Sequence, residues 1–414
     1  AMMTAPNLLD AYDTDAASDV LRDALERHAG LAGNPAHVAL EGQMARLHFF
    51  ADEMAESIAV ADRVLDQAEH QNLSDVLADT LITKGSALTA IGRAREGLML
   101  VAGGAEVAEA AGQSVTVLRA AINRGFSEGL DSQRTGLESA RTGIALARRL
   151  GLRSLLTFLT GNAAEYAIAT GDWDWAEREL AAQGDELEPS HHSIIVSGQA
   201  FFASARGRDA TPLLDETRRT AEALGDPSTV GQHLFARGMH HLVQGALRDA
   251  QRDFDASRET VVATGSNSRV QATRTAAWMG DRESLAARLQ EMDEAGEFGR
   301  SIEAVRASFR GALMALEGRT DEAVTLFRQA RRAFADLKLP WLEALSAMDA
   351  LYTLPVDHAE WAEARDAARA IFDSLGAAPM LAQIEAIETR GTTSAAPAAR
   401  EEATAGHAVA SEAV

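Results

Sequence analysis

A short glycine-centred sequence recurs along most of this chain at nearly constant spacing. Its centres lie 35 to 42 residues apart. The series consists of Gly92, Gly129, Gly171, Gly207, Gly245, Gly280 and Gly318. Glycine suits a sharp corner after a helix because it adopts positive φ without a steric penalty. A period in this range predicts a stack of helical hairpins.

The stretch 73–112 shows one such hairpin most clearly. Leu77, Leu81 and Leu88 are spaced by whole helical turns, so they share one face of a first helix. A second amphipathic helix follows the corner, and one hairpin cannot bury its own apolar face without neighbours of the same kind. A second glycine series marks the expected ends of the second helices: Gly112, Gly151, Gly225, Gly265 and Gly376.

These two interleaved series define the expected organisation of the chain. We expect a flexible segment over 1–18, a helical-repeat solenoid over 19–390 and a disordered tail over 391–414. The tail is small, polar and aperiodic, which is typical of disorder. The predicted fold class is all-α, a right-handed superhelical solenoid of degenerate hairpins in which each repeat contacts only its neighbours.

Composition restricts the partners and the compartment. The formal net charge of -22 argues against binding to nucleic acid or to anionic membranes, which both require clustered cations. The chain has no Cys, so disulfides and thiolate metal sites are impossible. We find no signal peptide in the opening AMMTAPNLLDAYDTD and no apolar run of the roughly 18 residues that a membrane span needs. We therefore expect a cytoplasmic protein with no membrane association.

No motif for catalysis or for a cofactor is recognisable. The histidines at 191–192, 233 and 240–241 form no H-E-x-x-H pattern, and zinc needs three convergent ligands. We interpret them as surface or groove-wall residues and expect no metal, no cofactor and no enzyme activity. Trp173 and Trp175 flank Asp174 just after a corner. We expect one of these tryptophans to pack between adjacent repeats, although an exposed aromatic anchor for a partner is the alternative.

The phase of the repeat resembles the tetratricopeptide motif. That motif has a small residue on the first helix, a Gly seven positions later, an Ala about five positions beyond it and then a large aromatic residue. The matching sets are Gly238–Gly245–Ala250 with Phe254, and Gly311–Gly318–Ala323 with Phe327. Pro212 and Gly97 replace the Ala in other repeats, so the repeats are degenerate.

Longer stretches resemble the helical-repeat region of large bacterial signalling ATPases. They are LADTLITKGSALTAIGRAREGLML, GNAAEYAIATGDWDWAEREL and ARAIFDSLGAAPMLAQIEAI. In that family an AAA-type ATPase precedes the repeats and is combined with a class III adenylate/guanylate cyclase domain or with a LuxR-type helix-turn-helix. The sequence has no G-x-x-x-x-G-K-[ST], and we expect these catalytic and DNA-binding modules to be missing. What the resemblance implies is a sensor or scaffold role.

The tetratricopeptide resemblance also implies a binding site. In such arrays the first helices line a concave groove, notably at positions six and ten residues before the corner glycine. The predicted groove residues are Arg119, Asn123, Asn162, Phe201, Phe235, Met239 and Arg274. An apolar floor beside Arg and Asn groups suits a peptide or a partner helix. The alternative is that some of these side chains contact neighbouring helices instead.

Two functions remain open at this point. The first is a non-catalytic protein- or peptide-binding scaffold or regulatory module in bacterial signalling, which binds through the groove. The second is a sensor domain in which a small molecule or peptide changes the shape of the superhelix. The sequence does not identify the partner or the oligomeric state.

Overall fold

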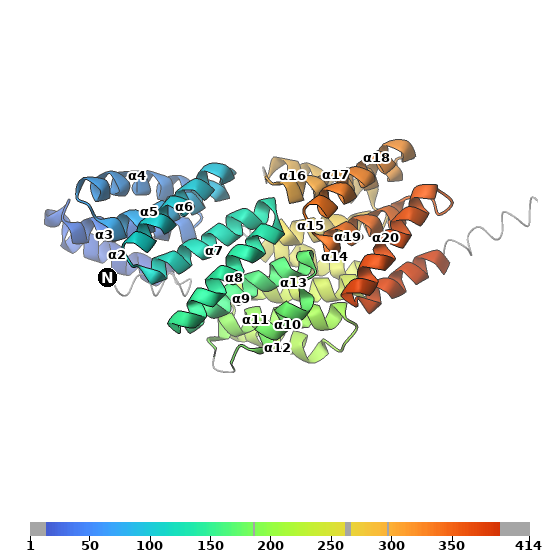
Figure 1. Cartoon of the computed structure of the whole chain (residues 1–414), viewed down its shortest axis with the longest axis horizontal. Coiled ribbons are helices and arrows are strands. Elements are labelled where there is room, and N and C mark those ends of the chain that lie inside the picture. The colour runs from blue at the N-terminus through green and yellow to red at the C-terminus, as the bar shows by residue number, and fades with distance from the viewer. Residues whose placement is uncertain (1–13, 185–186, 261–265, 296–297, 390–414) are drawn as a thin grey trace, which may run out of the picture. The chain divides into compact units, whose positions relative to one another are not determined.

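The computed structural model describes residues 14–184, 187–260, 266–295 and 298–389 (Figure 1). All regular elements in these ranges are helices, and they form a succession of antiparallel hairpins. The predicted fold class, an all-α solenoid of degenerate tetratricopeptide-like hairpins, is confirmed. No helix among the described residues is long and apolar enough to cross a membrane.

Each hairpin consists of a first helix, helix A, and a second, helix B. The A helices are α3 (Pro35–Phe50), α5 (Ser74–Ala90), α7 (Ser114–Asp131), α9 (Arg153–Thr170), α11 (Pro189–Ala205), α13 (Pro227–Val243), α15 (Ser266–Trp278), α17 (Arg300–Leu316) and α19 (Pro340–Thr353). The B helices are α4 (Met54–His70), α6 (Ala94–Ala110), α8 (Gln133–Leu150), α10 (Trp173–Ala181), α12 (Thr211–Leu224), α14 (Leu247–Thr260), α16 (Arg282–Glu294), α18 (Thr320–Asp336) and α20 (Ala359–Leu375). Helix α2 (Thr14–Arg27) and the 3₁₀ turn η1 (Ala29–Leu31) precede them, and a helix over 378–389, here called the terminal helix, follows.

The chain divides into two compact units, which are described separately. Unit 1 comprises 1–167 and 295–302, and unit 2 comprises 168–294 and 303–414. Helix α2 begins at Thr14, inside the segment that we expected to be flexible. The predicted tail lies outside the described residues.

Six of the predicted corner glycines have the expected left-handed backbone. Their φ values are 85° at Gly92, 76° at Gly171, 75° at Gly207, 74° at Gly245, 70° at Gly280 and 79° at Gly318. In the second series Gly112, Gly151, Gly225 and Gly376 also have positive φ, while Gly265 lies outside the described residues. The spacing therefore located these corners correctly.

The prediction of a corner at Gly129 is wrong. This glycine lies within α7, and the chain turns at Ser132, which is extended with φ -155° and ψ 118°. A Cβ built on Gly129 would lie 2.7 Å from Cε1 of Tyr166 in α9. Glycine at this position therefore serves the packing of two successive A helices.

Close helix approach stabilises the 73–112 hairpin of unit 1. A Cβ on Gly85 of α5 would lie 2.6 Å from the carbonyl oxygen of Gly97 in α6. A Cβ on Gly97 would in turn lie 2.3 Å from Oγ1 of Thr89. The two backbones thus pack against each other directly, and the fully buried side chains of Ile82 and Val101 complete the contact.

An aromatic cluster forms part of the core of unit 2. Trp173 of α10 lies with its ring centroid 6.0 Å from Phe201 of α11 and 5.3 Å from Trp341 of α19. Trp341 also lies 5.5 Å from Phe372 of α20. The expectation that one tryptophan of the Trp173–Trp175 pair packs between helices is confirmed. Unit 2 therefore brings its first helices against α19 and α20, which lie far along the sequence.

Candidate functional site

A row of polar side chains connects successive A helices in unit 1. Arg119 of α7 forms an ion pair with the carboxylate of Asp79 in α5, and its Nη1 also donates to the Asp79 carbonyl oxygen at 3.0 Å. Arg119 Nη2 donates to the hydroxyl of Thr83. Gln43 of α3 donates its amide to Asp79 Oδ2 at 3.3 Å. Asp79 thus links three A helices.

Asn123 extends this row by one helical turn. Ser86 of α5 donates its hydroxyl to Asn123 Oδ1 at 2.7 Å, and Asn123 Nδ2 donates to the carbonyl oxygen of Arg119 at 2.8 Å. The side chains of Arg119 and Asp79 remain 14% and 22% exposed, and Asn123 is half-buried. The row is therefore ordered by its own hydrogen bonds and still open to solvent.

Helix α9 places two further polar groups on one of its faces. Asn162 is half-buried, and Glu165, three residues later on the same face, is exposed. We define the A-helix face of unit 1 by the residues Asp79, Arg119, Asn123, Asn162 and Glu165; Thr83 and Ser86 are buried and support it from below.

The predicted groove residues in unit 2 have different surroundings. Phe201 and Met239 are each 4% exposed, and Arg274 is fully buried. Phe235 is half-buried, with its ring centroid 5.8 Å from that of Phe254 in the same hairpin. In this conformation Arg274 offers no surface to a ligand, and Phe201 and Met239 offer very little.

Asp349 of α19 is the residue that covers Arg274. Its Oδ1 accepts hydrogen bonds from Arg274 Nε at 3.2 Å and from Trp278 Nε1 at 2.7 Å, and its Oδ2 accepts one from the Ser308 hydroxyl at 2.7 Å. Ser308 also lies 2.8 Å from the hydroxyl of Ser346. Helix α19 therefore bonds to both α15 and α17, and the cation predicted for a groove is instead part of a buried network.

Sequence reasoning missed Asp349 and its role. The residue lies in the run LEALSAMDALYT, which is otherwise almost entirely apolar or small. Asp349 lies in the middle of this run, whereas Glu343 lies in the first turn of the helix. A carboxylate in the middle of an apolar helix indicates a buried partner of opposite charge, because a buried charge is costly when unpaired. Which of the arginines was the partner could not be read from the sequence, since the repeats that contain Arg274 and Asp349 are not consecutive.

The histidines occupy several environments. His233 is 6% exposed, with Nδ1 2.8 Å from the Thr217 hydroxyl, so the expectation of a surface or groove-wall position is wrong for this residue. His192 Nε2 lies 2.6 Å from Glu216 Oε1, and His241 Nδ1 lies 2.9 Å from Asp253 Oδ2. Within the described ranges no group of three or more His, Asp or Glu side chains could hold a metal ion.

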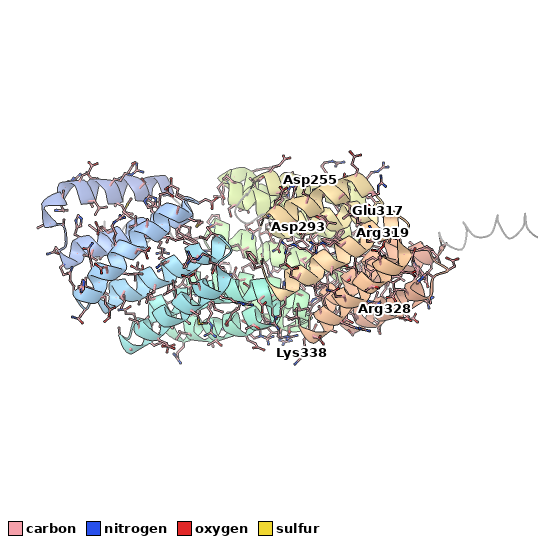
Figure 2. The ribbon with its side chains drawn as sticks, turned by 90° about the horizontal axis from the view of Figure 1, so that it is seen from above. Asp255, Asp293, Glu317, Arg319, Arg328 and Lys338 are labelled. Atoms are coloured by element: carbon pink, nitrogen blue, oxygen red, sulfur yellow. The ribbon has the colours of Figure 1, made fainter. Side chains whose placement is uncertain are left out.

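Ion pairs cover the outer, B-helix side of unit 2. Figure 2 labels charged residues that lie on or beside these helices. Asp255 of α14 pairs with Arg288 at 2.8 Å, and Asp293 of α16 pairs with Arg310 at 2.9 Å. Arg328 of α18 lies 2.7 Å from the buried carboxylate of Glu360. Much of the charge on this side is thus locally neutralised.

Comparison with known proteins gives similarity in fold only. Neither protein-family models nor curated protein sequences match the chain. Among solved structures, yeast Tom70 is similar at 12% identity and a TM-score of 0.33, with 94% of this chain and 88% of that chain covered. The APC/C hetero-tetramer Cut9-Hcn1 is similar at 14% identity and a TM-score of 0.30, with 94% and 86% covered.

Proposed function

We propose that this chain is a non-catalytic scaffold or regulatory module that binds a protein or peptide on the A-helix face of unit 1. One observation carries the proposal. The predicted groove residues Arg119, Asn123 and Asn162 remain partly open to solvent in unit 1, whereas Phe201, Met239 and Arg274 are covered in unit 2. An array of ordered, accessible hydrogen-bonding groups suits recognition of a peptide.

The chemistry of this face favours a neutral or basic segment. Arg119 is already neutralised by Asp79, so it adds no net positive charge that would attract an acidic ligand. The side chains of Asn123 and Asn162 carry both donors and acceptors, which suits a peptide backbone. Glu165 supplies an exposed carboxyl group beside them. We therefore propose that the bound segment presents backbone amides to the asparagines and a basic side chain to Glu165.

The remaining predicted residues take a secondary place in the proposal. Phe235 retains some exposure and can contribute an apolar contact to a ligand of unit 2. Phe201 and Arg274 contribute only after α19 moves away, because Trp341 and Asp349 of that helix cover them, and Met239 is buried as well.

The cellular setting is proposed from the sequence resemblance alone. The likeness to the repeats of bacterial signalling ATPases and the acidic composition support a regulatory module in the bacterial cytoplasm. In that setting the repeats transmit binding of a partner to a separate signalling protein. We propose no enzymatic step and no cofactor, and we propose no nucleic-acid partner because the net charge of -22 opposes phosphate binding.

Affinity capture from bacterial lysate tests the proposal. The baits are the wild-type chain, the double variant Asn123→Ala/Asn162→Ala, and Thr142→Ala as a matched control on the exposed side of α8. We expect a protein that the wild type and the control retain and the double variant loses. Equal recovery on all three baits would contradict the proposed face, and recovery of no protein would favour the sensor of a small ligand. Circular dichroism of each bait establishes that the substitutions leave the helices intact.

A further inference from the structure

The terminal helix packs across repeat corners that lie far earlier in the chain. A Cβ on Gly207, at the corner between α11 and α12, would lie 3.5 Å from Cγ of Pro379. A Cβ on Gly245, at the next corner, would lie 3.4 Å from Cγ of Gln383. Two successive glycine corners thus form a surface on which a helix lies closely.

Gln383 provides the polar part of this contact. Its Nε2 donates to the carbonyl oxygens of Leu242 at 3.0 Å and Val243 at 2.8 Å, at the C-terminal end of α13. The Leu242 carbonyl oxygen also accepts from the backbone N–H of Gly245 at 3.0 Å, so Gln383 shares this acceptor and adds a bond to the Val243 carbonyl. The last carbonyl groups of a helix have no i+4 partner within the helix, and side chains can satisfy them. We name Gly207, Gly245 and the carbonyl groups of Leu242 and Val243 the corner surface.

The same glutamine connects the corner surface to the buried network of unit 2. Gln383 Oε1 accepts a hydrogen bond from the hydroxyl of Tyr352 at 3.0 Å. The Tyr352 ring stacks on Trp278 with centroids 4.7 Å apart, and Trp278 Nε1 donates to Asp349 at 2.7 Å. Gln383 of the terminal helix therefore contacts Tyr352 of α19 directly, and Tyr352 in turn contacts the Trp278 side chain that bonds to Asp349.

The apolar attachment of the terminal helix is modest. Met380, Ile384 and Ile387 are buried, while Ala382 and Glu385 on its other side are exposed. Glu388 adds ion pairs to Arg365 and Arg369 of α20. By comparison no residue of α19 is exposed, whereas five of the twelve residues of the terminal helix are. Elements with little buried apolar surface open locally before the rest of the fold. The terminal helix therefore has the lower cost of detachment.

We propose that the terminal helix is a latch that occupies a helix-binding surface, and that a partner helix of the same chemistry displaces it. Such a helix carries residues like Ala378 and Pro379 where it crosses Gly207, and its polar residue lies where Gln383 crosses Gly245. It also carries a glutamine or asparagine that reaches the carbonyl groups of α13, followed by aliphatic residues in the positions of Ile384 and Ile387. This surface is separate from the A-helix face of unit 1, so the inference stands independently of the proposed function.

Hydrogen exchange measured by mass spectrometry on the full chain tests whether the latch opens. Gln383→Ala removes both donated hydrogen bonds, and we expect it to speed exchange of 378–389 about tenfold while α5 is unchanged. Glu385→Ala, on the exposed side of the same helix, is the matched control and leaves the rate unchanged. A terminal helix that exchanges as slowly as α19 in both the wild type and Gln383→Ala would overturn the proposal.

A peptide of the sequence 377–389 with a fluorescent label tests whether the corner surface binds a helix in trans. Fluorescence anisotropy should show that it binds the full-length Gln383→Ala chain about tenfold more tightly than the wild type, since the competing latch is weakened. The same peptide with its glutamine replaced by alanine should bind more weakly to both chains. If the latch of Gln383→Ala opens in the exchange experiment but the peptide binds neither chain, the corner surface is not a helix-binding site.

Discussion

Replacing Asp349 by alanine should destabilise unit 2 severely. The side chains of Asp349 and Arg274 are both 0% exposed, and the carboxylate accepts hydrogen bonds from Arg274, Trp278 and Ser308. Asp349→Ala leaves the guanidinium of Arg274 charged and buried without its counter-ion. Breaking a buried ion pair in this way costs about 3–5 kcal/mol of unfolding free energy.

Two further variants separate the charge from the shape. Burial raises the pKa of Asp349, while the charge of Arg274 and the hydrogen bonds from Ser308 and Trp278 oppose this shift. Asp349→Asn keeps the shape and removes the charge, and we expect a loss of about 1.5–3 kcal/mol, the usual value of hydrogen bonds to a charged group. The double variant Arg274→Met/Asp349→Leu should recover most of the loss, because an apolar pair of similar volume needs no desolvation of charge.

The distribution of tryptophan makes the assay specific for unit 2. The chain has five tryptophans, at positions 173, 175, 278, 341 and 361, and all lie in unit 2. Urea unfolding followed by tryptophan fluorescence therefore reports on this unit, while circular dichroism at 222 nm reports on helices of both. A loss below about 1 kcal/mol for Asp349→Ala would refute the buried ion pair, since exposed pairs give values of that size. An Asn variant as stable as wild type would show that Asp349 is protonated.

Three other perturbations test separate parts of the fold. Gly129→Ala should destabilise unit 1 by about 1–3 kcal/mol, because a Cβ at this position would lie 2.7 Å from the Tyr166 ring. Gly103→Ala in α6 has no neighbour within 4 Å and should stabilise the chain by about 0.5–1 kcal/mol. Thermal unfolding followed by circular dichroism measures both variants, and equal effects would contradict the close packing of α7 and α9. Burial and the nearby Arg237 hold the pKa of His233 below its ordinary 6.5. Below pH 6.5 the unfolded chain therefore binds more protons than the folded chain, and the stability of unit 2 should fall as the pH drops. Fluorescence midpoints at pH 7.5 and about 5.5 test this, and a fall that is no smaller in His233→Gln would assign the effect to other groups. Glu360→Gln should lower the free energy of unfolding by about 2–4 kcal/mol, because this fully buried carboxylate pairs with both Arg328 and Arg331. A midpoint of urea unfolding equal to that of the wild type, measured by fluorescence, would contradict the prediction.

Local features of the fold were predictable because they depend on residues that are close in sequence. Glycine spacing located six corners, since positive φ is a local requirement that glycine meets best. It failed at Gly129, where the requirement is instead the approach of an aromatic ring from the next repeat. Spacing alone cannot distinguish a glycine needed for its φ from one needed for its missing Cβ.

The closure of unit 2 could not be predicted, because it depends on contacts between distant repeats. Arg274 was predicted to line the groove because it lies six residues before a corner glycine. This spacing does not indicate which other helix packs over that position. Asp349 covers Arg274 from 75 residues away, and Gln383 bonds to Leu242 and Val243 of another repeat from still farther along the chain. In unit 1 the predicted groove residues Arg119 and Asn123 bond to helices of nearby repeats and remain partly open.

Site-specific photo-cross-linking tests the binding face most directly. A photoreactive benzoylphenylalanine is placed at Asn123 or Asn162 on the A-helix face of unit 1, and at Ala145 on the exposed side of α8 as the control. The account predicts that a partner isolated by affinity capture cross-links at positions 123 and 162 and not at 145. Cross-links from 145 alone would place the partner on the B-helix side and contradict the proposed function.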